Sequence, residues 1–103
     1  MARKAGMVLR FRGVRGSHPV PGPRTVRYGG NTSCVEVQAG GHRILLDAGT
    51  GIISLGDELF QAQVTPQAET AVAESIVLTI LFSHTHYDHT QGLPFFKPIF
   101  LPS

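Results

Sequence analysis

A cluster of metal-ligand residue types, placed directly after an apolar segment, constrains this chain more than any other feature. The cluster lies within six residues and comprises His84, His86, Asp88 and His89. The preceding residues 76–82 are almost entirely apolar, as in a buried strand. In an extended segment, residues two apart project from the same face, about 6–7 Å from one another. The spacing therefore predicts that His84, His86 and Asp88 share one face at the end of a strand.

The residue types in this cluster predict a metal site. Imidazole and carboxylate groups are ligands that zinc, manganese and iron take in proteins. A lone histidine is usually structural, but four ligand types in six positions favour metal binding. Two divalent ions about 3.5–4 Å apart could share the cluster. We expect one ion on His84 and His86. We expect the other on Asp88 and His89, with zinc as the first candidate and manganese or iron as alternatives.

Two segments of the chain resemble the motifs of a known superfamily. Residues 84–89, followed by Gly92, resemble the metal motif of the metallo-β-lactamase superfamily. Residues 45–51 are similar to its earlier motif, a strand that ends in an Asp, here Asp47. From about Met7 onward the chain is similar to the N-terminal half of such a domain. Two opening segments, residues 11–17 and 27–34, narrow the resemblance to one branch of the superfamily. They resemble most the branch that contains ribonuclease Z and cyclic-phosphate phosphodiesterases.

The resemblance implies an α/β fold, namely the N-terminal half of an αββα sandwich with a mixed sheet and helices on its outer face. It implies one incomplete metallo-hydrolase domain over residues 1–103, with residues 1–6 as a flexible tail. The superfamily completes its metal site with a further His, a bridging carboxylate and a last His, and none of these has a matching position here. We therefore expect the chain to need a missing C-terminal half or a second chain, and to form homo-oligomers or aggregate when alone.

The function implied for the complete domain is metal-dependent hydrolysis. The resemblance favours a phosphodiesterase that acts on a nucleotide, a cyclic phosphate or RNA through a metal-activated water. It implies that Asp88 also orients the attacking water. It further implies that Asp47 accepts an N–H from a metal-bound imidazole and so fixes the tautomer of that ring. The alternative for Asp47 is a local turn, in which the carboxylate bonds its own backbone.

Two other functions stay open at this point. The same motif serves the hydrolysis of thioesters, lactones and lactams, so these substrates are the alternative among enzymes. Outside enzymes, the alternative is a non-catalytic fragment that binds nucleic acid or protein, because the ligand set is incomplete. Metal occupancy together with turnover would discriminate between the enzymes and the binding fragment.

Positive charge is concentrated at the start of the chain. Residues 1–27 contain seven basic and no acidic side chains, whereas the remainder contains two basic and seven acidic ones. A basic segment attracts phosphate-bearing ligands or nucleic acid. Residues 13–30 are rich in turn formers, and we expect the basic side chains of this long loop to contact substrate phosphate. These side chains are Arg15, Arg24 and Arg27. Arg10 and Arg12 are expected to form the solvated face of a strand.

The remaining patterns are those of an α/β domain. Helical spacing predicts a helix over residues 52–63, in which Gly56 is either tolerated or marks close packing. The apolar run at residues 76–82 predicts a strand that is covered on both faces. Residues 93–101 are also apolar and need a surface to pack against. Period-two alternation and turn residues predict three further strands, the last two forming a hairpin, at residues 7–12, 33–38 and 43–46.

Composition is typical of a globular protein, with 42% hydrophobic and 16% charged residues. One cysteine, Cys34, excludes an internal disulfide framework, and we expect it to be a small buried hydrophobe. The longest apolar run is too short to span a bilayer, and no secretory signal is visible. We therefore expect no membrane partner and a cytoplasmic location.

Overall fold

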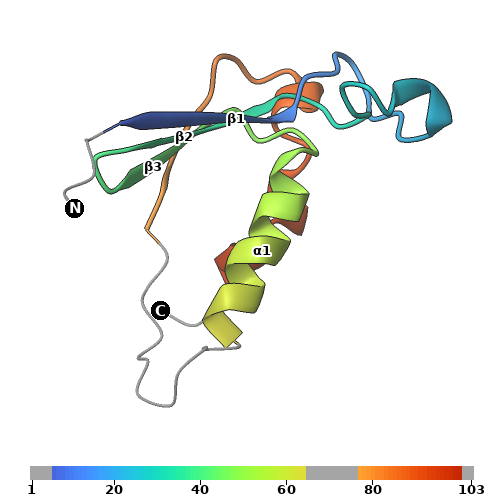
Figure 1. Cartoon of the computed structure of the whole chain (residues 1–103). Coiled ribbons are helices and arrows are strands. Elements are labelled where there is room, and N and C mark those ends of the chain that lie inside the picture. Colours follow the sequence, from blue (N-terminus) through green and yellow to red (C-terminus); the bar gives the residue numbers. More distant parts are fainter. Residues whose placement is uncertain (1–5, 65–76, 101–103) are drawn as a thin grey trace.

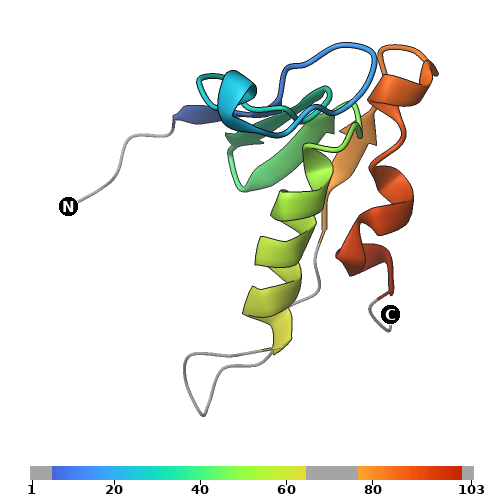
Figure 2. The ribbon, with the colours of Figure 1, turned by 90° about the vertical axis from the view of Figure 1, so that its right-hand side faces the viewer.

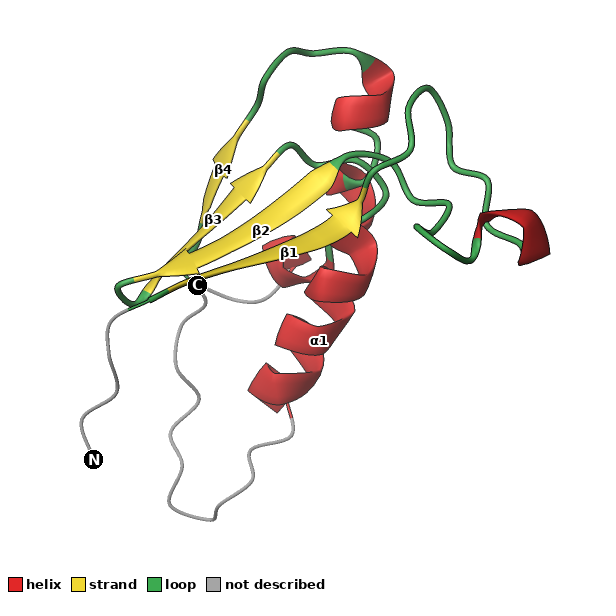
Figure 3. Ribbon diagram, turned by 45° about the horizontal axis from the view of Figure 1, so that its top comes forward, coloured by secondary structure: helices red, strands yellow, loops and turns green. Residues whose placement is uncertain are grey.

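A computed structural model describes residues 6–64 and 77–100 of the chain (Figure 1). Four strands form one sheet in the order β1-β2-β3-β4 (Figure 3). They are β1 (Met7–Gly13), β2 (Cys34–Ala39), β3 (His42–Leu46) and β4 (Thr79–Leu81). β1 pairs antiparallel with β2, β2 and β3 form the predicted hairpin, and β3 and β4 pair parallel. The mixed sheet confirms the α/β prediction, and the first three strands lie within one residue of their predicted bounds.

One α-helix, α1 (Ile52–Val64), follows β3 and lies against one face of the sheet (Figure 1). Its apolar residues recur at helical spacing, which gives it one face to bury. Short 3-10 helices complete the described chain: η1 (Pro23–Thr25), η2 (Tyr87–His89), η3 (Leu93–Phe95) and η4 (Lys97–Phe100). The last two run beside α1 (Figure 2). The predicted helix therefore exists, and its bounds differ from the prediction by one residue.

The core lies between the sheet, α1 and the segment that contains η3 and η4. Its buried members are Cys34, Leu45, Ala48, Ile52, Leu55 and Phe96. Cys34 is buried as predicted, and burial raises the pKa of its thiol to about 12. A thiol with so high a pKa is a poor nucleophile at neutral pH. Cys34 therefore serves the core and not the chemistry.

Gly56 marks close packing. A Cβ built at this position of α1 would lie only 2.6 Å from Cδ1 of Phe96. Phe96 is 2% exposed, so its ring is held in the core and cannot easily move away. Part of the apolar segment 93–100 therefore packs against α1. Phe95, Ile99 and Phe100 remain exposed.

An ion-pair network joins the sheet to α1. Glu36 on β2 is completely buried, and its Oε1 accepts hydrogen bonds from Nε and Nη2 of Arg12 at 2.9 and 2.7 Å. Arg12 also reaches Glu58 of α1, while Arg43 lies 3.0 Å from the other oxygen of Glu36. The prediction of a solvated Arg12 was therefore wrong, because its guanidinium bridges β1 and β2 to the helix.

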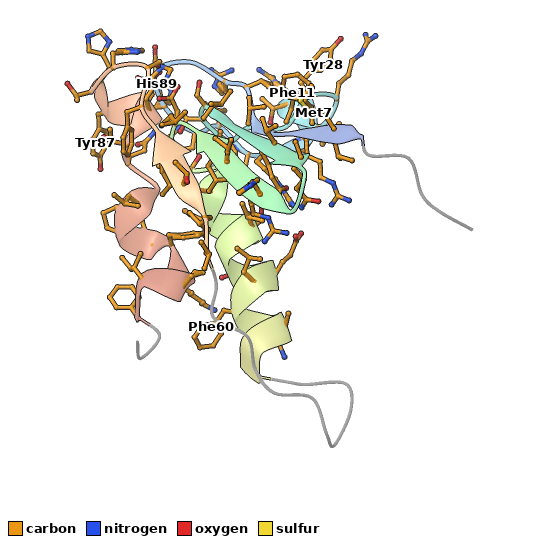
Figure 4. All side chains as sticks on the ribbon, turned by 90° about the vertical axis from the view of Figure 1, so that its left-hand side faces the viewer. Met7, Phe11, Tyr28, Phe60, Tyr87 and His89 are labelled. Carbon is orange, nitrogen blue, oxygen red and sulfur yellow. The ribbon has the colours of Figure 1, made fainter. Side chains whose placement is uncertain are left out.

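The sheet face away from α1 is apolar and exposed. Arg12 faces α1, and side chains alternate along a strand, so Phe11 and Leu9 of β1 face the opposite way. Figure 4 shows Met7 and Phe11 on that side. Leu46 of β3 and Leu81 of β4, which pair in the sheet, are exposed as well. This face lacks cover from the described residues, so the sheet is an open layer.

The prediction for residues 76–82 was only partly right. β4 has three residues, of which Ile80 is partly buried and packs on the core while Thr79 and Leu81 are exposed. The strand is therefore covered on one face, because α1 lies on one side of the sheet only. Ile76, Leu101 and residues 1–5 of the predicted tail lie outside the described residues. Within the described residues, no helix is long and apolar enough to cross a membrane.

Candidate metal centre

The histidine cluster lies where the chain leaves β4. Residues 82–86 are irregular, and the 3-10 helix η2 begins at Tyr87. Asp88 and His89 therefore lie on a turn and not on an extended strand. The prediction that Asp88 projects from the same extended face as His84 and His86 was wrong for that reason. The turn instead brings His89 back toward His84.

Three imidazole rings gather at this turn. The ring centroid of His84 lies 4.5 Å from that of His86, with the planes at 78°. The centroid of His84 lies 4.1 Å from that of His89. Figure 4 places His89 at the end of the sheet where β4 leads into the turn. The spacing of two residues did bring the first pair together, as predicted.

Asp47 lies at the end of β3, beside this cluster. Its backbone has φ 69°, a left-handed conformation that Asp and Asn tolerate better than most other residues. Its carboxylate is bound to the cluster and not to its own turn. Oδ1 accepts a hydrogen bond from the Ser83 amide at 2.7 Å, and Oδ2 accepts one from Nδ1 of His89 at 2.8 Å. The predicted contact between Asp47 and an imidazole is therefore present.

The electrostatics of Asp47 favour its charged form. Burial opposes ionisation of the carboxyl group, since the residue is 7% exposed. The hydrogen bonds from Ser83 and His89 outweigh that cost and lower the pKa of Asp47 below its ordinary value. A charged carboxylate can only accept, so Nδ1 of His89 carries the proton. Nε2, the other ring nitrogen of His89, faces Oδ2 of Asp88 at 3.4 Å.

Ser83 connects Asp47 to a second histidine. Its hydroxyl lies 2.8 Å from Oδ2 of Asp47 and 2.9 Å from Nδ1 of His84. Ser83 directly precedes His84 in the irregular segment after β4, so the hydrogen bonds of Ser83 to Asp47 also hold the start of the cluster near the end of β3. Asp47 thus reaches His89 directly and His84 through one hydroxyl.

Asp88 is held by the long loop between β1 and β2. The backbone amide of Ser17 donates to Oδ2 of Asp88 at 3.0 Å, and Nε2 of His89 lies 3.4 Å from the same oxygen. The Ser17 hydrogen bond lowers the pKa of Asp88, helped by the nearby His89. Ser17 has φ 73°, so its backbone adopts an uncommon conformation to present this amide. The loop and the metal motif therefore meet at Asp88.

A buried polar network fixes the loops beneath the cluster. The hydroxyl of Thr32, which is fully buried, accepts hydrogen bonds from the Thr50 amide at 2.7 Å and from Nε2 of Gln91 at 3.0 Å. A Cβ at Gly49 would lie 2.5 Å from the carbonyl oxygen of Asp88, so only glycine allows this approach. The segments after β1, β3 and β4 are thereby locked to one another.

The donor chemistry of the cluster fits a divalent metal, since it offers imidazole nitrogens and a carboxylate. The position of His89 supports the fit, because Asp47 engages Nδ1 while Nε2 faces Asp88, the neighbouring carboxylate of the cluster. Across residues 6–64 and 77–100, however, no three such side chains converge tightly enough to enclose an ion. The described part of the chain therefore does not form a closed ligand set.

The three predicted arginines line one pocket, and none of the clustered histidines is among its lining residues. Arg15, Arg24 and Arg27 line a pocket of about 440 Å³ with Tyr28. The guanidinium carbon of Arg27 lies 5.3 Å from the centre of the Tyr28 ring, and Nε of Arg15 donates to the carbonyl of His18. Among the described residues, none of the three arginines forms an ion pair with a carboxylate. Their charge is available to an anionic ligand.

Sequence reasoning missed two residues of the site, Ser83 and Ser17. Ser83 had a signal in the sequence, because a hydroxyl directly before a ligand-type histidine can bond its ring. Ser17 acts through its backbone amide, 71 residues from Asp88 in the sequence, and no residue pattern indicates such a contact.

Comparison with known proteins identifies the family of the chain. Residues 42–102 match the family described as the Beta-lactamase superfamily domain, which is more than half of the chain. A stretch of 54 residues is 46% identical to Ribonuclease Z from Pyrobaculum arsenaticum. That stretch is 52% of this chain but only 15% of the relative. No solved structure matches the chain. The family match covers β3, α1, β4 and the histidine cluster, and the chain belongs to the beta-lactamase superfamily.

Proposed function

We propose that the chain carries the metal-binding part of a metal-dependent phosphodiesterase. The observation that supports this most is the pairing of Asp47 with Nδ1 of His89, which directs Nε2 of that ring toward Asp88. In this proposal His84 and His86 bind one ion, and Asp88 and His89 bind the other. Zinc is the first candidate, with manganese or iron as alternatives. When bound, such ions supply a nucleophilic water at neutral pH and polarise phosphoryl oxygens.

The residues of the chain then have separate tasks. Asp47 orients the ring of His89, and Asp88 orients the attacking water. Arg15, Arg24 and Arg27 bind substrate phosphate, since guanidinium groups pair well with phosphate oxygens. The similarity to Ribonuclease Z favours RNA or another phosphodiester as the substrate. The remaining ligands come from a C-terminal half or from a second chain that covers the open face of the sheet.

A hydrolysis assay with added zinc or manganese tests this proposal in the natural protein. A phosphodiester such as bis(p-nitrophenyl) phosphate and an RNA oligonucleotide should be cleaved, and His84→Ala should remove the activity. His42→Ala is the matched control, because His42 is an exposed residue at the start of β3, and it should leave the activity unchanged. Turnover of a thioester or lactone but of no phosphodiester would contradict the proposed substrate class. Absence of all turnover in metal-loaded protein would favour a binding fragment.

Substitution of the arginines tests their part in the proposal. Arg24→Ala and Arg27→Ala should raise KM for an RNA oligonucleotide about tenfold or more and change kcat little, because they bind the substrate away from the reacting atoms. Unchanged KM values would show that the pocket does not bind the substrate.

A further inference from the structure

The loop between β1 and β2 presents an exposed aromatic ring beside its arginines. Tyr28 is 73% exposed, and the guanidinium carbon of Arg27 lies 5.3 Å from the centre of its ring. Figure 4 places Tyr28 at the outer edge of the molecule, with its side chain pointing away from the sheet. So exposed a ring contributes little to the stability of the core. The ring is instead available to a planar ligand.

The pocket that Tyr28 lines is positively charged. Its charged side chains are Arg15, Arg24 and Arg27. Nε of Arg15 donates to the carbonyl of His18 at 3.2 Å, but among the described residues none of the three guanidinium groups forms an ion pair with a carboxylate. Cations that share one pocket repel each other, so an anion between them lowers the electrostatic energy. A phosphate fits best, because its oxygens match the donor geometry of guanidinium groups.

Hydrogen bonds fix the shape of the loop around this pocket. The amide of Val20 donates to the carbonyl of Gly30 at 2.8 Å and closes the segment 20–30 at its base. Within the segment, the Thr25 hydroxyl donates to the carbonyl of Val20 at 2.6 Å, and the amide of Gly29 donates to the carbonyl of Thr25 at 2.7 Å. A Cβ at Gly30 would overlap the backbone of Val20, so this closure needs glycine. The side chains of the pocket are therefore carried on a backbone that binding does not need to order.

We propose that the pocket is a nucleotide subsite, in which the arginines bind a phosphate and an unpaired base stacks on Tyr28. Every nucleobase has a planar face that can stack on an aromatic side chain. A base within a duplex already stacks on its neighbours, so the subsite selects single-stranded nucleotides. Ser17, whose amide holds Asp88, lies two residues after Arg15, so the subsite and the histidine cluster share one loop. As a part of substrate recognition, the subsite rests on the function proposed above and narrows its substrate class to nucleotides.

Calorimetric titration of the metal-free natural protein tests this proposal. The ligands are uridine monophosphate and the ribose phosphate that lacks its base, so the base is the only difference between them. We expect uridine monophosphate to bind about tenfold more tightly, as is usual when one base stacks on an aromatic ring. Tyr28→Leu should lower its affinity to that of the ribose phosphate, whereas Tyr28→Phe should preserve the difference. Because Tyr28 is exposed, neither substitution should prevent folding.

Tyr87→Leu is the matched control, because Tyr87 is also 73% exposed but is not among the residues that line the pocket. It should leave both affinities unchanged. Arg24→Ala should weaken the two ligands by the same factor, since both carry the phosphate. Equal affinities of the two ligands in the wild type would overturn the proposal, and so would an undiminished preference for uridine monophosphate in Tyr28→Leu. Binding of neither ligand would overturn it as well.

A second titration distinguishes an RNA strand from a free mononucleotide as the ligand. The probes are a uridine oligonucleotide alone and the same strand paired with its adenosine complement. If the subsite takes an unpaired base of RNA, Tyr28→Leu should weaken binding of the single strand and leave binding of the duplex unchanged. Binding of uridine monophosphate that depends on Tyr28, without such an effect on the single strand, would support the subsite with a free mononucleotide as its ligand.

The titrations need neither metal nor turnover. Failure of the phosphodiesterase assay would therefore leave a subsite that depends on Tyr28 intact. Equal binding of the two phosphates would in turn leave the phosphodiesterase proposal intact.

Discussion

Replacing Asp47 by Asn is the most informative single change in this protein. Asn tolerates the left-handed backbone that Asp47 adopts at φ 69°, so the turn after β3 should survive. The hydrogen bonds should not. Three donors, the amide and hydroxyl of Ser83 and Nδ1 of His89, converge on two carboxylate oxygens. A carboxamide offers a single oxygen and places an NH₂ group against the remaining donors.

The magnitude follows from this count. At least one hydrogen bond to a charged group is lost, and such a bond contributes about 1.5–3 kcal/mol. Asp47 is buried, so water cannot easily replace the missing partner. If the NH₂ group faces His89, that ring must turn its Nδ1 lone pair toward it and place its proton on Nε2. We therefore expect metal affinity to fall by about 10–100-fold as well.

Two assays measure these effects in the natural protein. Urea denaturation without metal should show the loss of stability, and metal titration should show the loss of affinity. Asp57→Asn is the matched control, because Asp57 lies on α1 and, among the described residues, forms an ion pair with Lys97 at 3.4 Å near the surface. Asp57→Asn should change both values little. If Asp47→Asn did the same, Asp47 would merely shape its turn, and the reasoning from its hydrogen bonds would be refuted.

Three further predictions concern the parts of the fold that support the site. Burial opposes ionisation of Glu36, but Arg12 and the other partners of Glu36 lower the pKa of this carboxyl group below its ordinary value. Ionised Glu36 therefore stabilises the folded protein above pH 4.5, and this stabilisation is lost as the pH falls through the lowered pKa. Glu36→Gln should therefore reduce the free energy of unfolding at neutral pH and flatten its acid dependence in urea denaturation; an unchanged acid slope would contradict this. Gly56→Val should cost about 1–3 kcal/mol in the same assay, because the added side chain overlaps Phe96, and a gain in stability would argue against that packing. Phe11→Lys should reduce self-association of the 103-residue chain in sedimentation, since Phe11 is 71% exposed on the open apolar face; equal association would show that this face is not the contact.

The elements of this fold could be predicted where the pattern is local. Alternation and helical spacing are properties of neighbouring residues, so β1, β2, β3 and α1 were placed within one residue. The sequence predicted that Gly56 is either tolerated in the helix or marks close packing. It did not indicate that Phe96 is the residue packed against Gly56. That choice depends on how η3 and η4 fold back along α1.

The apolar run before the histidines shows where local pattern fails. It indicates burial but does not say on which face, because cover depends on the layers that pack against the sheet. α1 covers one face, so β4 is half-buried and Leu81 is exposed. Arg12 shows the reverse error. The position of Arg12 predicts a side chain on the solvated face of a strand. Its guanidinium instead forms hydrogen bonds with Glu36 and with Glu58 of α1.

In the site, too, the local features could be predicted from the sequence and the long-range contacts could not. The ligand types were evident because they lie within six residues, and the contact of Asp47 with an imidazole followed from the resemblance. The particular partners could not be read from the sequence, since Asp47 lies 36 residues from Ser83 and 42 from His89. The turn at η2 was missed because the extended spacing argument took no account of the 3-10 helix that begins at Tyr87.

Metal content is the measurement that tests the central claim most directly. Elemental analysis of the natural protein should find bound divalent metal. His84→Ala and Asp88→Ala should each lose part of that metal, from different sites, and His42→Ala should lose none. Full metal content in both His84→Ala and Asp88→Ala would contradict the assignment of this cluster as a centre for two metal ions.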